Sequence, residues 1–154
     1  MRKQIRVPSF FVSVLVLIAM VIIPVYASNQ IQWRSYEDGK SIARSERKKI
    51  FMNFRADWCN YCRTMEKNTF TDTDIVAFLN SNFISIKIDV DRQKSLAQKY
   101  NIQPLPDTWF LTASGDVIGN RPGYLSPQDL LPLLRYIHTE SYQKMSFSQF
   151  KESL

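Results

Sequence analysis

Cys59 and Cys62 are the residues whose type and spacing most clearly allow chemistry, with Asn60 and Tyr61 between them. The chain has two cysteines in all, so it can form one internal disulfide and not a disulfide framework. A short apolar run ends at Phe54, and helical character begins at Cys59. Unpaired amide groups and the dipole at the start of a helix stabilise a thiolate. This context predicts a redox-active pair.

The two cysteines are expected to play different parts in disulfide exchange. Cys59, at the helix start, is predicted to be exposed and nucleophilic. Cys62, one turn later, is predicted to be shielded and to resolve the mixed disulfide that Cys59 forms with another protein. Both are therefore candidate catalytic residues.

Two other interpretations of the pair are a fixed structural disulfide and half of a metal site that a partner completes. A bridge across so small a loop constrains the unfolded chain little, which weakens the structural interpretation. Thiolates can hold copper(I), but no cluster of Met or His residues surrounds the pair. The chain has one histidine, His138, and a zinc site needs four ligands. We expect no metal, and no flavin or nicotinamide site is visible.

Residues 1–27 are predicted to be a signal peptide. They combine a basic start with a long apolar stretch, and Val25-Tyr26-Ala27 suits cleavage after Ala27. The alternative is an uncleaved membrane anchor, because the apolar stretch is nearly long enough to span a bilayer. Under both interpretations residues 28–154 are exported, and a bacterial periplasm is a compartment in which disulfides form. Contact with a membrane is expected only if this segment is retained.

Charge gives little support for nucleic-acid binding. Three of the 20 basic residues lie in residues 1–27, so 17 basic and 14 acidic side chains would remain, a net charge of about +3. No basic run is interleaved with stacking aromatic residues. The cluster from Arg47 to Lys49 is interpreted as the solvent-exposed end of a helix.

Alternating helices and strands are predicted after the export segment. An edge strand or lead-in is expected over 28–34, helices over 35–49, 59–68, 72–79, 93–100 and 126–138, and strands over 50–54, 83–90, 108–111 and 117–118. This order predicts an α/β fold with a mixed central sheet flanked by helices on both faces. Residues 28–140 would form the domain. Residues 141–154 would form a tail with a short docking helix, whose face carries Phe147, Phe150 and Leu154.

The ten residues from Phe54 to Arg63, Phe-Arg-Ala-Asp-Trp-Cys-Asn-Tyr-Cys-Arg, resemble the active-site segment of thioredoxin-like proteins. The extension from Met65 to Phe70 is similar to the C-terminal periplasmic domain of membrane thiol:disulfide interchange reductases. The resemblance covers roughly residues 31–137 and includes Lys87 in a central strand. It implies a thioredoxin fold.

The resemblance also implies substrate-binding residues. Pro106 falls where the family has a cis-proline opposite the cysteines, so Leu105 would offer backbone hydrogen bonds to an extended substrate. Trp58 would form a wall of the site and pack against the disulfide. The alternative is a purely structural role, in which Pro104 or Pro106 only ends the preceding helix and keeps the next strand in place.

The residues expected to support the site are Asn53, Asn60, Tyr61 and Lys87. The first three, together with Asp107, depart from the family pattern. Asn53 stands where thioredoxins carry a buried carboxylate, and an amide cannot accept the proton of the resolving thiol. We therefore expect Cys62 to deprotonate slowly unless water or Lys87 substitutes. Asn60 and Tyr61 replace the common Gly-Pro pair and change the potential by an amount that the sequence does not give. Asp107 follows the proline in place of Thr and would disfavour a thiolate if it points inward.

The resemblance favours an enzyme that reduces or exchanges disulfides of exported proteins. Its electrons would come from a membrane or soluble thiol:disulfide reductase, since no cofactor is expected. One alternative is a disulfide oxidase or isomerase, although an isomerase usually needs a second domain. Another is a non-catalytic thioredoxin-fold module that binds a client protein or a metal.

Overall fold

The computed structural model describes residues 29–154, and the predicted signal peptide or anchor at 1–27 lies outside the described residues. A five-stranded sheet forms the centre, in the order β1-β3-β2-β4-β5. The strands are β1 (Trp33–Arg34), β2 (Lys49–Arg55), β3 (Phe83–Asp89), β4 (Asp107–Leu111) and β5 (Val117–Pro122). β1, β3 and β2 are parallel, whereas β4 and β5 are antiparallel to their neighbours. The mixed sheet predicted from the sequence is confirmed.

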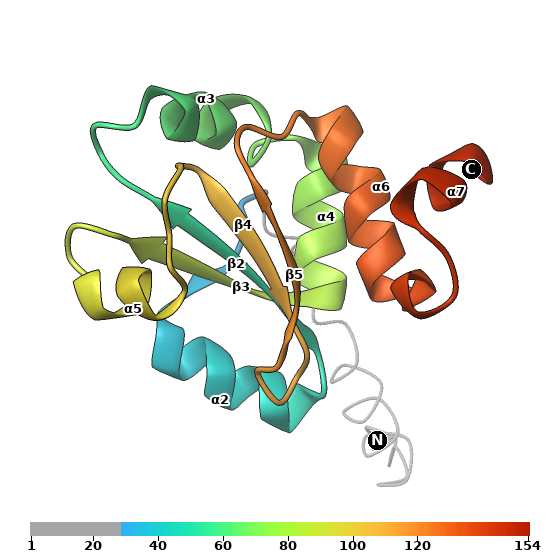
Figure 1. Cartoon of the computed structure of the whole chain (residues 1–154), viewed down its shortest axis with the longest axis horizontal. Coiled ribbons are helices and arrows are strands. Elements are labelled where there is room, and N and C mark those ends of the chain that lie inside the picture. Colours follow the sequence, from blue (N-terminus) through green and yellow to red (C-terminus); the bar gives the residue numbers. More distant parts are fainter. Residues whose placement is uncertain (1–28) are drawn as a thin grey trace, which may run out of the picture.

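Helices cover both faces of this sheet (Figure 1). The helices on the sheet are α2 (Tyr36–Glu46), α3 (Asn60–Asn68), α4 (Thr73–Asn82), α5 (Lys94–Lys99) and α6 (Pro127–His138), and α7 (Phe147–Glu152) packs on α6. Side chains of α4 and α6 bury one face together with Phe51 and Phe110. Side chains of α2 and α5 lie against the other face, where Met52, Phe54 and Ile86 are buried. Strand alternation explains the division, because neighbouring residues of β2 point to opposite faces.

The helix starts follow local capping rules. Ser35, Asp72 and Ser126 each accept a hydrogen bond from the first turn of α2, α4 and α6, and Pro127 takes the first helical position of α6. Gly39 lies inside α2, where a Cβ atom would come within 2.5 Å of the Ile86 side chain. Glycine therefore lets α2 approach β3 closely.

Two predicted boundaries were wrong. The first helix ends at Glu46, because Arg47 adopts a left-handed conformation (φ 54°) and its N–H closes the helix. Lys49 thus begins β2 and forms an ion pair with Glu140 (2.7 Å) instead of ending a helix. β5 extends to Pro122, well beyond 117–118, because an exposed edge strand lacks an apolar pattern.

The tail packs on its own domain. It contains a 3-10 turn (Ser141–Gln143) and α7. Phe147 and Phe150 both contact the ring of Tyr136, whose hydroxyl donates a hydrogen bond to the Met145 carbonyl (2.6 Å). Leu154 follows the end of α7 and is 66% exposed, so it does not share the docked face as predicted.

Candidate active site

Cys59 and Cys62 form a disulfide at the start of α3, with their Cα atoms 5.2 Å apart. Cys59 is the N-cap residue of this helix, and its Sγ accepts a hydrogen bond from the Cys62 N–H (3.1 Å). The predicted position of the pair, directly after a buried strand and at a helix start, is confirmed. An amide aimed at Sγ, together with the helix dipole, favours negative charge on Cys59 after reduction.

The disulfide is more deeply covered than the sequence suggested. Cys59 is 5% exposed and Cys62 1% exposed. Cys59 is therefore not an exposed residue in the oxidised protein, contrary to the prediction. The reason is packing: Ala56 is buried with both cysteines, and Val90 and Leu105 lie against them.

Trp58 forms one wall of a groove beside the disulfide. Its side chain is 66% exposed, and its Nε1 donates a hydrogen bond to Oδ2 of Asp91 (2.9 Å). The groove has a volume of about 360 Å³ and is also lined by Val90, Leu105 and residues of α5. The Asp91 hydrogen bond orients the indole across the groove from α5.

The loop before β4 faces this groove with Leu105. The peptide bond between Leu105 and Pro106 is cis. The carbonyl of Pro106 accepts a hydrogen bond from the Gly123 N–H (2.7 Å), which fixes the loop to the chain leaving β5. Gly123 has a φ of 94°, a conformation that suits glycine. Tyr124, the next residue, is 37% exposed, and Tyr61 between the cysteines is 67% exposed.

Asn53 and Asp107 lie on opposite faces of the sheet. Asn53 is 2% exposed, and its Nδ2 donates to Oγ1 of Thr108 (3.1 Å), on the face that α3 covers. Asp107 accepts hydrogen bonds from Trp109 Nε1 (2.9 Å) and from Asn120 Nδ2 (3.2 Å). Burial raises the pKa of Asp107, although these donors oppose the shift. The carboxyl group of Asp107 is thus tied to β5 and does not point inward behind Cys62.

Lys87 does not stand free beside Cys62. Its Nζ lies 3.2 Å from Oε1 of Glu66 and 4.5 Å from the ring centroid of Trp33. Lys87 is therefore engaged by Glu66 and Trp33, and its substitution for the missing carboxylate stays a prediction.

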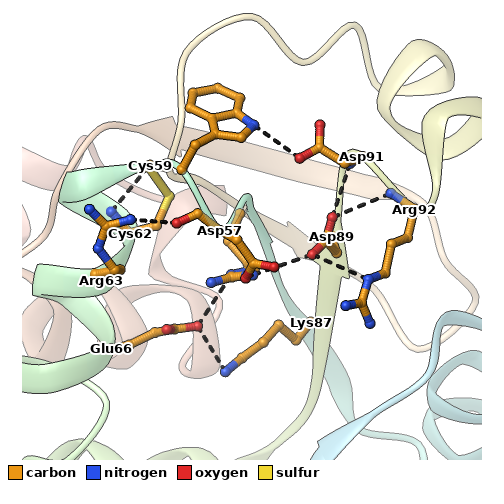
Figure 2. A network of polar contacts seen from close by, with 11 residues as sticks. Asp57, Cys59, Cys62, Arg63, Glu66, Lys87, Asp89, Asp91 and Arg92 are labelled. Atoms are coloured by element: carbon orange, nitrogen blue, oxygen red, sulfur yellow. Dashed lines mark hydrogen bonds and ion pairs between the residues drawn. A yellow bond between two sulfur atoms is a disulfide. The ribbon is translucent and has the colours of Figure 1, made fainter.

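A charged network that the sequence analysis missed lies beside the disulfide (Figure 2). Arg55 ends β2 and forms ion pairs with Asp57, with Glu66 (3.4 Å) and with Asp89 (3.3 Å). Burial disfavours the Arg55 charge, but its carboxylate partners outweigh burial and raise its pKa. The hydrogen bond from Arg55 lowers the pKa of Asp57. One signal in the sequence could have pointed to this network. Glu66 lies one helical turn after Cys62, which places a carboxylate near the cysteine pair.

Arg63 braces the first turn of α3. Its guanidinium donates hydrogen bonds to the carbonyl of Asp57 and to Oδ1 of Asn60. It therefore connects the segment before Cys59 to one of the two residues between the cysteines.

Within residues 29–154, no group of three or more His, Cys, Asp or Glu side chains is arranged to hold a metal ion. In the same part of the chain, no helix has the length and apolar character needed to cross a bilayer.

Known proteins share both the sequence pattern and the fold. Residues 36–138 match the family model described as a thioredoxin-like domain. The thiol:disulfide interchange protein DsbD of Vibrio vulnificus (strain CMCP6) is 32% identical over 84 residues, and that of Colwellia psychrerythraea is 34% identical over 85 residues. Each match covers 52% of this chain but 14% of the relative, so the chain corresponds to a small part of these longer proteins.

Solved structures agree on the fold. A thioredoxin from Thermus thermophilus superimposes with a TM-score of 0.65 at 21% identity, covering 70% of this chain and 87% of that one. A thioredoxin-fold protein from Helicobacter pylori gives a TM-score of 0.63 at 16% identity, covering 84% and 89%. The family model spans most of the described residues and includes the Cys59–Cys62 disulfide. The chain therefore belongs to the thioredoxin-like family.

Proposed function

We propose that this protein is a thiol–disulfide oxidoreductase that reduces or exchanges disulfides of exported proteins through Cys59 and Cys62. The observation that carries the proposal is the disulfide at the N-terminus of α3, where the Cys62 amide donates to the Cys59 sulfur. This geometry prepares Cys59 to act as a thiolate and leaves Cys62 within bonding distance of it. The resemblance to interchange proteins supports the same chemistry.

The exchange would run in two steps. The Cys59 thiolate attacks one sulfur of a client disulfide, that disulfide breaks, and its other sulfur leaves and takes up a proton. The Cys62 thiol then loses its proton and attacks the Cys59 sulfur of the mixed disulfide. The second client sulfur leaves and is protonated, and the Cys59–Cys62 disulfide forms again. Two electrons have passed from the dithiol to the client.

Client binding would use the groove beside the disulfide. Leu105 lies in a bend outside the helices and strands of residues 29–154, so the sheet does not use its main chain. We assign Leu105 to main-chain pairing with an extended client segment, and Pro106 to shaping the loop. Trp58 would close the groove on the other side, where its contact with Asp91 holds it.

We propose that electrons flow from the dithiol to the client, so that the client is reduced. The proposed location is the periplasm or the outer face of the inner membrane. A membrane or soluble thiol:disulfide reductase would then restore the dithiol, because net reduction of clients consumes two electrons in each cycle. The relatives of this protein are named thiol:disulfide interchange proteins, and that name supports successive disulfide exchanges between proteins. An oxidase or isomerase would use the same two cysteines in the opposite or in both directions.

The reduction potential tests both the activity and its direction. The purified protein is equilibrated with glutathione buffers of increasing ratio, thiols are trapped by alkylation, and mass spectrometry counts them. Reversible titration with a potential near that of thioredoxin, about −270 mV, is the expected result. A potential near about −120 mV marks an oxidant and overturns the reductive direction. A pair that does not titrate, or that retains a metal tightly, overturns the oxidoreductase assignment.

A further inference from the structure

Arg55 occupies an unusual place for a charged residue. It is the last residue of β2, and its side chain is 12% exposed. Three carboxylates surround its guanidinium: Asp57, Glu66 and Asp89. Nε of Arg55 is buried and makes no hydrogen bond, so its contact with Glu66 at 3.4 Å is an ion pair alone. A buried cation in such surroundings is held by charge rather than by saturated hydrogen bonding.

The three carboxylates come from three segments that meet beside the disulfide. Asp57 precedes Cys59 by two residues, Glu66 lies one turn beyond Cys62 on α3, and Asp89 ends β3 (Figure 2). The parallel register of β2 and β3 pairs Arg55 with Asp89, which brings the two strand ends together. The network therefore lies where β2 and β3 end, between these strands and α3, the helix that begins at the dithiol.

The network also reaches Trp58. Oδ1 of Asp89 accepts a hydrogen bond from the main-chain N–H of Asp91 (3.0 Å), and the Asp91 carboxylate holds the indole of Trp58. Arg55 thus connects, through Asp89 and Asp91, to the residue that precedes Cys59. Removing the guanidinium would therefore leave the carboxylates without their cation and would loosen the contacts that position Trp58.

We propose that Arg55 is a positioning residue for the dithiol, whose largely buried charge offsets Asp57, Glu66 and Asp89 and so stabilises the reduced form. The proposal rests on the proposed function, because it concerns the same exchange. Negative charges close to a thiol disfavour its thiolate. A cation among them reverses part of that effect, and more strongly at a site shielded from water.

Other cations contribute less. Lys87 pairs with Glu66, but its side chain is 30% exposed. Arg92 lies 3.9 Å from Asp89 with 80% of its side chain exposed, where solvent screens its charge. Arg63 binds a carbonyl and an amide oxygen, not a carboxylate. Arg55 is the member of the network that is both largely buried and in contact with three acidic groups.

The balance with glutathione gives the sign of the effect. Two glutathione thiols and the Cys59–Cys62 disulfide exchange to give the dithiol and one glutathione disulfide. If Cys59 ionises on reduction, anything that stabilises the thiolate shifts this equilibrium toward the dithiol. Loss of Arg55 is therefore expected to favour the disulfide and to make the protein more reducing.

The test uses the full-length protein with Arg55→Gln and Arg55→Lys. Two quantities are measured: the pH dependence of thiolate absorbance and the equilibrium constant with glutathione. For Arg55→Gln we expect the acid dissociation constant of Cys59 to fall roughly threefold to tenfold. The exchange equilibrium should shift toward the disulfide by a similar factor, and tenfold corresponds to about 30 mV. Arg55→Lys keeps the positive charge, so both the acid dissociation constant of Cys59 and the exchange equilibrium should stay close to their wild-type values.

Two further variants keep the test decisive if Arg55→Gln does not fold. Glu66→Gln removes one carboxylate from a half-buried position and should shift both quantities in the opposite direction. Arg92→Gln makes the same charge change as Arg55→Gln at an exposed position and should shift them less than twofold.

The proposal is overturned if the wild type titrates normally while Glu66→Gln and a folded Arg55→Gln leave both quantities unchanged. It is also overturned if Arg55→Lys shifts both quantities as much as Arg55→Gln does, because the effect would then not depend on the positive charge. Failure of the wild type itself to exchange with glutathione would instead refute the proposed function.

Discussion

Asn53 and Arg55 are two residues apart on β2 and face the same side of the sheet, yet their surroundings are opposite. Asn53 is neutral, almost completely buried and bonded to the hydroxyl of Thr108. Arg55 is charged and meets three carboxylates where the strand ends. An isolated charge is costly in a buried strand and is tolerated where opposite charges pair with it. The comparison leads to the expectation that charge at the dithiol is controlled from the end of β2, at Arg55, and not from the buried position of Asn53.

The largest effect, on turnover, is expected from Cys62→Ser. This variant tests whether Cys62, the cysteine for which Asn53 replaces a carboxylate, acts as the resolving thiol. Without Cys62 the mixed disulfide on Cys59 cannot be released, so turnover of a model disulfide should fall roughly hundredfold or more. Mass spectrometry should detect the trapped adduct. Cys59→Ser, the control, should lose turnover without forming an adduct. Normal turnover by Cys62→Ser would remove the basis of the comparison.

A smaller effect is expected from Asn53→Asp, which makes the buried position resemble the charged one. The new carboxyl would be buried, and burial raises a carboxyl pKa. Its protonated form suits the fold, so the free energy of unfolding should fall as pH rises through that raised pKa, by about 1–3 kcal/mol. Urea denaturation across pH measures this loss.

Asn53→Asp should also change the rate at which Cys62 releases a client, because a carboxylate can accept the thiol proton. Stopped-flow reduction across pH measures that rate. Asn68→Asp makes the same chemical change at an exposed position of α3 and should leave the rate unaltered. If Asn53→Asp gives the wild-type rate at every pH, the missing carboxylate does not limit Cys62.

The smallest effect is expected from Asp107→Asn, on the opposite face of the sheet. Burial raises the pKa of Asp107, so its contribution to stability is complete below the unfolded-state pKa and is lost as pH rises through the folded-state pKa. Relative to the variant, the wild type should lose free energy of unfolding from about pH 4 upward. Urea midpoints at a series of pH values measure the difference.

Asp116→Asn is the matched control for that measurement. Hydrogen bonds from Ser114 and Thr112 lower the pKa of Asp116, so its contribution has the opposite sign. Relative to this variant, the wild type should lose stability as pH falls. Slopes of equal sign for the two variants would contradict the assignment of Asp107 as a buried carboxyl.

The sequence was most informative where periodicity and local capping agree. Ile84, Ile86 and Ile88 alternate with polar residues and predicted β3, which the structure confirms. The break before Cys59 and the helix after it placed the disulfide correctly. These signals are local, because each depends on residues within one or two turns or strands.

The charged network could not be found in this way. Arg55, Glu66 and Asp89 are distant in sequence and meet only through the register of β2 with β3 and the placement of α3. The burial of Cys59 was missed for a similar reason, since Leu105 covers it from a loop more than forty residues away. Such contacts follow from tertiary packing, which periodicity does not encode.

The exposed indole of Trp58 also gives the protein an optical reporter. Of the three tryptophans, Trp58 adjoins the disulfide, whereas Trp33 lies beneath Lys87 and Trp109 donates to Asp107. Emission from Trp58 is therefore expected to respond to the oxidation state of the neighbouring cysteines, and emission from Trp109 to ionisation of the Asp107 carboxyl. Single-tryptophan variants would separate the two signals and follow redox and acid–base events independently, in real time and without an added dye.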